Sequence, residues 1–270
     1  MIKFENVGLA SPEQMEFIIQ GMRNPMNSWE KSDSDTDPDF YSLENIEIGS
    51  ADHSLMQRLS DAGTEHRKYM RMMPVYVRIT APLYWWKEFD TYKVGTVANS
   101  CSTMHKIAEK EFSLEDFSCE HLGVFIPAEK NDGVEDYQNL WIAALEETID
   151  YLNVARTFYN RETDPELKKK YWWQMIQLLP SSYNQTRNVM LNYEVLANIY
   201  RQRKNHKLDE WREFCKWIET LPYSELITVK KKPFSVLSPM LEPRYVYAQN
   251  ECISPDVDRI SEHLKTLWLR

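Results

Sequence analysis

Residues 192–206 contain the side chains whose types and spacing most clearly suggest chemistry. Asn192 precedes a stretch with helical character, and its side-chain oxygen can accept a hydrogen bond from a free amide of the first turn. The far end of the stretch carries Arg201 and Arg203, followed by His206. A guanidinium suits a phosphate because it donates two parallel hydrogen bonds, and a helix N-terminus attracts anions. The segment therefore predicts an anion-binding site.

The two arginines are expected to point in different directions. On a helix, residues two apart are separated by about 200°. Arg203 follows Ile199 by four residues and Tyr200 by three, so it stays near the face expected to be buried. One of the two arginines can then face a pocket while the other faces water. The alternative is a cluster of cations that only complements the helix dipole, and residue types alone leave both interpretations open.

A second candidate is a polar segment that follows the aromatic stretch 84–86. Small polar side chains are dense there: Thr91, Thr96, Asn99, Ser100, Ser102 and Thr103. Polar clusters beside aromatic residues are typical of ligand-pocket walls. Cys101 and His105 lie four residues apart and could form a nucleophile and base. A half-buried polar loop without chemistry is the alternative.

The metal-binding patterns are weaker. The set Cys101, His105, Cys119 and His121 matches no common zinc spacing. The aspartates of the acidic loop 27–50 alternate as in a calcium loop but lack its glycine. We therefore expect a solvated loop and no metal.

Bulk properties limit the class of protein. The chain has 270 residues, 43% of them hydrophobic, and a net charge of −9. The negative charge disfavours nucleic acid and anionic membranes as partners. The N-terminus shows no secretory signal, and no apolar run approaches the ~20 residues that span a bilayer. The four cysteines are widely spaced, as expected of reduced thiols. We expect a cytoplasmic protein.

Periodicity predicts a helix-rich α+β fold in which helices pack on a small central sheet. We expect one domain over residues 1–270. The predicted strands are 1–10, 75–80 and 186–192, with strand-like pieces within 91–102. The predicted helices are 12–22, 52–72 with a break near Gly63, 83–90, 136–159, 165–178, 193–203, one from Asp209 and one from Ser254.

Two segments together resemble the flavin-dependent thymidylate synthases. One is the strand 77–80 that ends in Ala81-Pro82, followed by a short helix and the polar segment. The other contains Leu179-Pro180, a strand ending in Asn192, a helix reading LANIYRQR over 196–203, and His206. The resemblance covers roughly residues 50–220 and leaves a C-terminal extension, 222–270, outside it.

This chain departs from the family in its basic motif, R-H-R-x-x-S-x-N-E-x-S-x-R-Y. Aligned from Ala81-Pro82, the R-H-R triplet falls on residues 91–93, where only Lys93 keeps a positive charge. The first serine falls on Thr96, the glutamate on Asn99 and the second serine on Cys101, while a slip of one residue would place Ser102 there.

The resemblance implies roles for the candidate residues. It implies that Arg203 and Ser102 act on the substrate. The residues expected to bind the nucleotide are Arg203, Arg201, Lys93, Thr96 and Ser100. The residues expected to bind the cofactor are Asn192, Tyr92, Asn99 and His206.

The resemblance also implies an activity, the methylation or hydroxymethylation of dUMP or a relative at C5. FAD would be the cofactor, with methylenetetrahydrofolate and NADPH as co-substrates. The family builds each site from several subunits, which implies a homotetramer or another homo-oligomer. Because most of the basic motif is lost, two alternatives stay open. One is a catalytically inactive protein that binds or sequesters a nucleotide, and the other is an interaction protein that keeps only the fold.

Overall fold

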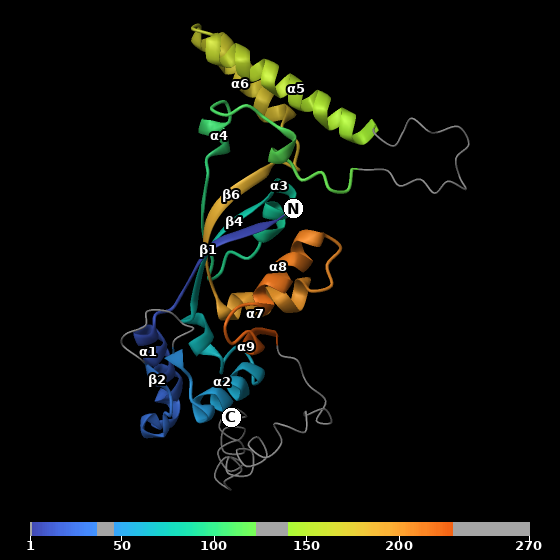
Figure 1. Ribbon diagram of the computed structural model, residues 1–270. Helices are drawn as coiled ribbons and strands as arrows, with labels where there is room; N and C mark the ends of the chain where they lie inside the picture. The colour runs from blue at the N-terminus through green and yellow to red at the C-terminus, as the bar shows by residue number, and fades with distance from the viewer. Residues whose placement is uncertain (1, 37–45, 123–139, 229–270) are drawn as a thin grey trace, which may run out of the picture.

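The computed structural model describes residues 2–36, 46–122 and 140–228 and is built around one antiparallel sheet (Figure 1). The four strands lie in the order β1-β4-β6-β5. Their bounds are β1 Lys3–Leu9, β4 Pro74–Pro82, β5 Val97–Ser100 and β6 Asn184–Asn192. The register aligns Glu5, Arg78, Asn188 and Asn99 in one row across the sheet. The predicted α+β class is confirmed.

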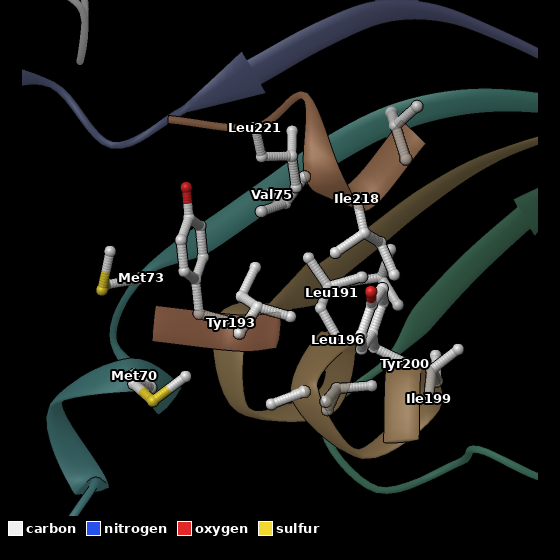
Figure 2. Close-up of a cluster of buried hydrophobic side chains, with 14 of the residues drawn as sticks. Met70, Met73, Val75, Leu191, Tyr193, Leu196, Ile199, Tyr200, Ile218 and Leu221 are labelled. Carbon is white, nitrogen blue, oxygen red and sulfur yellow. The ribbon is translucent and has the colours of Figure 1, made fainter. Parts of the chain in front are cut away.

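Helices cover one face of this sheet. Because side chains alternate along a strand, Val75, Val77 and Ile79 of β4 point to the same face, and all three are buried. The covering elements are α3 Leu83–Phe89, α7 Tyr193–Arg203, α8 Asp209–Glu219 and α9 Glu225–Thr228. Figure 2 shows Val75, Leu191, Leu196 and Ile218 meeting in this core.

Aromatic residues fill the space between α3 and α8. Trp85 stacks on Phe89 with ring centroids 5.1 Å apart and contacts Trp211 at 4.8 Å. Pro82 is the last residue of β4, and α3 begins at Leu83, whose amide donates to the Tyr183 carbonyl at 3.0 Å.

A smaller group of elements lies at the end of the sheet where β1 ends and β4 begins. Their bounds are α1 Pro12–Arg23, η1 Asn24–Met26, η2 Trp29–Lys31, β2 Asp35–Thr36, β3 Ile46–Glu47, α2 Ser50–Asp61 and η4 Lys68–Arg71. The prediction of a helix from residue 12 to about 22 is confirmed. Ser11 accepts from the Gln14 amide, and the Gln14 side chain accepts from the Ser11 amide, which forms a capping box.

The acidic loop 27–50 is more structured than the sequence suggests. The Asp33 carboxylate accepts hydrogen bonds from the amides of Ala51 and Asp52, at 2.9 and 3.0 Å, and so caps α2. Asp52 is fully buried and pairs with Arg23 at 2.6 Å. Ser32 and Asp33 are exposed, as expected of a solvated loop, but residues 32–34 also hydrogen-bond to Asp52 of α2, which pairs with Arg23 of α1, while 37–45 lie outside the described residues.

A helical hairpin forms the other end of the molecule (Figure 1). It consists of α5 Leu140–Arg161 and α6 Pro165–Leu178, and the short helices α4 Thr103–Lys106 and η5 Leu114–Asp116 lie next to it. Leu152 and Met175 are fully buried in a second apolar cluster with Phe112 and Phe117. No helix of the described part has the length and hydropathy to cross a bilayer. The predicted helix from Ser254 lies outside the described residues.

Candidate functional site

The face of the sheet opposite the helices is open. On β4, Tyr76 is 54% exposed and Arg78 is exposed, in contrast to their buried neighbours on the other face. Arg78 Nε donates to Asn188 Oδ1 at 3.2 Å. A groove of about 480 Å³ runs over this row and is lined by Glu5, Arg78, Asn99, Ser100, Cys101, Thr186 and Asn188.

A larger cavity of about 770 Å³ continues from this groove toward the hairpin. Both are lined by Cys101 and Thr186. Thr186 Oγ1 lies 2.7 Å from Thr80 Oγ1, and Lys3 pairs with Thr80 in the strand register, so one row of polar side chains crosses the cavity floor. Ser102 lines the wall and caps α4 by accepting from the His105 amide at 3.2 Å.

The charge of this open face is mixed. The larger cavity is lined by Lys3, Lys106, Lys110, Glu115, Asp116 and Glu120. Lys110 pairs with Asp116 at 2.7 Å, and Lys106 pairs with Glu109. Within the described residues, Lys3 and Arg78 form no ion pair, so they are the cations that remain for an anionic ligand.

A second group of predicted residues lies on the helix side of the sheet. Arg203 Nη1 lies 2.6 Å from the Glu88 carboxylate and 3.0 Å from His206 Nε2. Its Nε donates to the Tyr92 hydroxyl at 2.8 Å, and its guanidinium lies over the Trp211 ring at 4.7 Å. The Arg203 side chain is 18% exposed. The structure thus brings Arg203, Tyr92 and His206 together.

The two arginines of α7 do point apart, as their spacing predicts. Arg201 is exposed, and its Nη2 donates to Asn198 Oδ1 at 2.5 Å. Arg203 is half-buried on the side toward α3 and α8.

Gly95 lies close to Asn192 and Val195 where the polar segment crosses the start of α7. Asn192 Oδ1 accepts from the Val195 amide at 3.0 Å, which confirms its prediction as an N-cap. Gly95 has φ +78°, and a Cβ there would lie 2.9 Å from Val195 Cγ2 and 3.1 Å from Asn192 Nδ2. The Thr96 hydroxyl donates to the Tyr92 carbonyl. Lys93 is exposed.

The predicted residues therefore form two groups in one protomer. Asn99, Ser100 and Ser102 line the open face, whereas Tyr92, Arg203 and His206 lie on the helix side. Residues that the sequence interpretation missed include Lys3, Arg78, Thr80, Thr186 and Asn188. The period-two alternation of residues 75–80 was the available signal, because it places Arg78 and Thr80 on the same face as Tyr76.

The weaker nucleophile and metal patterns gain no geometric support. Within the described residues, no hydrogen bond joins Cys101 to His105, and both are exposed. No group of three or more His, Cys, Asp or Glu side chains gathers as a metal site in residues 2–36, 46–122 and 140–228. His121 instead lies 3.2 Å from Asp209.

The fold is similar to that of solved enzymes that act on nucleotides. The flavin-dependent thymidylate synthase ThyX from Helicobacter pylori, complexed with FAD and dUMP, is 15% identical. The match covers 85% of this chain and 97% of that chain with a TM-score of 0.53. The UMP/dUMP methylase PolB from Streptomyces cacaoi, bound with 5-Br dUMP, is 13% identical over 85% of this chain and 95% of that chain, with a TM-score of 0.52.

Comparison of sequences finds no match, in contrast to comparison of structures. No family model matches the chain, and no curated protein matches it. At identities this low, the likeness shows the fold alone. This chain has the fold of the flavin-dependent thymidylate synthases.

Proposed function

We propose that this protein is a cytoplasmic enzyme that binds a pyrimidine nucleoside monophosphate, dUMP or a close relative, on the open face of its sheet. The observation that carries the proposal is the row of Arg78, Asn188 and Asn99 beside the exposed ring of Tyr76. ThyX and PolB, which share the fold, were solved with dUMP and 5-Br dUMP respectively. These two structures support a pyrimidine nucleotide as the class of ligand that this chain binds.

The side chains of the open face suit the parts of such a nucleotide. Amide groups donate and accept hydrogen bonds, as a pyrimidine edge requires, and Asn99 and Asn188 supply two. Arg78 and Lys3 can bind the phosphate. The hydroxyls of Ser100 and Ser102 can contact base or ribose. The two volumes, about 480 and 770 Å³, fall in the range of small-molecule pockets.

We further propose that a second copy completes the site. Arg203 lies on the helix side of its own sheet, so it cannot reach the open face of the same protomer. Arg203 of another copy would contact the nucleotide from the opposite side, and we propose that the exposed Arg201 and Lys93, with Thr96, also bind the nucleotide. This arrangement makes the protein a homo-oligomer, and a homotetramer would contain four such shared sites.

FAD is the cofactor that this fold suggests. Asn99 lies on the open face, Tyr92 and His206 lie on the helix side, and Asn192 is occupied as an N-cap. These residues fit FAD only where two copies meet. When bound, FAD would carry reducing equivalents from NADPH, while methylenetetrahydrofolate would supply the one-carbon unit for C5. The residues of this chain bind the nucleotide and orient its base.

A catalytically inactive nucleotide-binding protein is the second candidate, and a specific observation favours it. Thr91 and Tyr92 stand where the resemblance places two basic residues. The guanidinium of Arg203, which the resemblance assigns to the nucleotide, is paired with Glu88. The loss of these basic residues and the pairing of Arg203 with Glu88 should each weaken binding of the two anionic ligands, the nucleotide and FAD.

The experiment that separates these candidates begins with the absorbance spectrum of the freshly purified protein. Bound flavin, together with tritium release from C5-labelled dUMP in the presence of NADPH and methylenetetrahydrofolate, supports the enzyme. A colourless protein whose melting temperature rises with dUMP but that releases no tritium supports the inactive binder. If neither dUMP nor FAD changes the melting temperature, the proposal is wrong and only the fold is retained.

A further inference from the structure

The groove on the open face contains one carboxylate that the proposed nucleotide contacts leave out. Glu5 of β1 pairs with Arg78 in the strand register, so its side chain lies on the same face of the sheet as Arg78. Glu5 is exposed and lines the groove of about 480 Å³. Within the described residues, its carboxylate accepts no hydrogen bond and forms no ion pair. Because a carboxylate repels a phosphate, Glu5 suits another part of the ligand, one that donates hydrogen bonds.

The amide of Asn188 has a fixed orientation beside this carboxylate. Asn188 Oδ1 accepts from Arg78 Nε at 3.2 Å. A guanidinium carries only donors, so the amide atom that faces it must be the oxygen. The Nδ2 group of Asn188 therefore remains for a ligand, and it can only donate hydrogen bonds. Asn188 is exposed and lines the same groove.

The strand order sets the sequence of acceptors and donors across the groove. Glu5 belongs to β1, an edge strand, whereas Asn188 and Asn99 belong to β6 and β5. The row therefore has an acceptor-only group at one end and a donor farther in, followed by Asn99, whose amide can also donate. Within the described sheet no strand lies beyond β1, so no strand places a donor on the outer side of Glu5.

Cytosine and uracil differ in the order of the groups along the edge that such a row would contact. Cytosine presents an amine at C4, which donates, and then N3 and O2, which both accept. Uracil presents a carbonyl at C4, then N3–H, which donates, and then a second carbonyl. A row of acceptor, donor and donor matches cytosine at all three places. With uracil, a carbonyl oxygen would face the Glu5 carboxylate, and N3–H would face the Asn188 amide hydrogens.

We propose that the base bound in this groove is cytosine, so that the preferred ligand is dCMP or another cytosine nucleoside monophosphate. Glu5 accepts from the amine at C4, Asn188 donates to N3, and Asn99 donates to O2. Arg78 holds the Asn188 amide through Nε, and its terminal nitrogens remain for the phosphate. The inference rests on the proposed nucleotide site and narrows its ligand, because dUMP becomes the relative that binds there more weakly.

The ratio of two dissociation constants tests this assignment. Calorimetry on the full chain measures the constants for dCMP and for dUMP, which carry the same phosphate and the same deoxyribose. Contacts to those groups therefore cancel in the ratio, and only contacts to the base remain. We expect the wild-type protein to bind dCMP about tenfold or more tightly than dUMP, because a carboxylate accepts from the cytosine amine and repels the uracil carbonyl.

Two variants test the residues that are assigned to the base. Glu5→Gln introduces an amide that can donate to a uracil carbonyl, so the preference for dCMP should fall about tenfold and be lost. Asn188→Asp keeps an acceptor for Arg78 but removes the donor to N3, and it should also reduce the preference. Glu5 is exposed and unpaired within the described residues, so Glu5→Gln should keep the wild-type melting temperature. Glu30→Gln, at an exposed position on η2, is the matched control and should keep the wild-type ratio.

The outcomes separate this inference from the proposed function. If the wild-type protein binds dUMP as tightly as dCMP or more tightly, the nucleotide site is retained but the assignment of cytosine is wrong. If Glu5→Gln weakens both ligands equally, Glu5 contacts the deoxyribose and not the base, which also overturns the assignment. If neither nucleotide binds, the proposed function itself is wrong, and the inference falls with it.

Discussion

The Arg203 guanidinium lies 2.6 Å from the carboxylate of Glu88, a residue 115 positions earlier in the chain. Glu88 Oε2 also accepts from Trp211 Nε1 at 2.9 Å, and the arginine lies over the ring of the same tryptophan. The carboxylate thus engages Nη1, one of the guanidinium nitrogens with which an arginine binds a phosphate. An anionic ligand that uses this arginine must compete with Glu88.

Replacement of Glu88 by Gln should therefore tighten dUMP binding. Glutamine keeps an acceptor for Trp211 but removes the negative charge, so Arg203 becomes available to the ligand. We expect the dissociation constant for dUMP, measured by calorimetry, to fall about tenfold, which corresponds to about 1.4 kcal/mol. Arg203→Ala should raise it. Asp90→Asn, which neutralises the partner of Arg187 at 2.7 Å, is the control and should change nothing.

Arg78 provides a test of the open face itself. Arg78→Met keeps much of the side-chain length but removes the charge, so it should weaken dUMP binding about tenfold or more. Deoxyuridine has no phosphate, and its weaker binding should be the same in the variant and in the wild type. Equal losses for both ligands would mean that Arg78 does not contact the phosphate. Arg58→Met, on α2, is the matched control.

Much of the fold could be predicted because its signals are local. Ser11 and Asn192 cap α1 and α7 through hydrogen bonds to amides three residues on. Each is a side-chain type that favours this position, followed by a helical period. The α7 helix was therefore predicted with its N-cap, and the opposite directions of Arg201 and Arg203 followed from its geometry.

The open face could not be predicted, because it depends on strand order and register. Glu5, Arg78, Asn188 and Asn99 come from four strands, and only pairing across the sheet aligns them. The sequence of a single strand reveals which side chains share a face, but not which strands pair with it or in which register. The same reason explains Asp33, whose cap on α2 joins segments that sequence periodicity treats as unrelated.

Asp52 should make the stability of this protein sensitive to acid. Burial alone would raise the pKa of its carboxyl, but hydrogen bonds from Ser34, Ser32 and Arg23 outweigh burial and lower the pKa below its ordinary value of 3.8. A lowered pKa in the folded state means that the stabilisation is complete above the ordinary value and is lost as pH falls through the lowered one. Urea unfolding between pH 6 and 3 measures this loss.

The Asp52→Asn variant supplies the comparison for that experiment. It leaves Arg23 buried without its charged partner, so we expect a loss of about 3–5 kcal/mol at pH 6. Its stability should also fall less between pH 6 and 3 than that of the wild type. Asp61→Asn, at an exposed position on the same helix, should keep the wild-type dependence. Parallel curves for Asp52→Asn and the wild type would contradict the assignment.

Gly95 should tolerate no side chain, because two independent features oppose one. Its φ of +78° is unfavourable for other residues, and an added Cβ would lie 2.9 Å from Val195 Cγ2. We expect Gly95→Ala to lower the free energy of unfolding by about 1–3 kcal/mol. Gly21 lies in α1 with nothing within 4 Å of an added Cβ, so Gly21→Ala should instead stabilise by about 0.5–1 kcal/mol. Equal effects at the two positions would contradict this explanation.

Cys101 offers a chemical footprint of ligand binding. Its thiol is exposed, and it lines both the groove and the larger cavity of the open face. Saturating dUMP should therefore slow its alkylation by iodoacetamide about tenfold, because only the fraction of unoccupied sites reacts. Mass spectrometry of the peptides follows each cysteine separately. Cys119, which lines neither the groove nor the cavity, should react at the same rate with and without dUMP.

Cys215 completes the footprint as a negative reference. Burial raises the pKa of this thiol to about 12, with a further contribution from Glu219, and the thiolate is the species that iodoacetamide attacks. Cys215 should therefore stay unmodified until the protein unfolds, so its reaction reports any loss of native structure during the assay. If Cys101 reacts equally fast in saturating dUMP while Cys215 stays protected, the nucleotide does not bind over the open face. Protection of Cys101 alone places the ligand there.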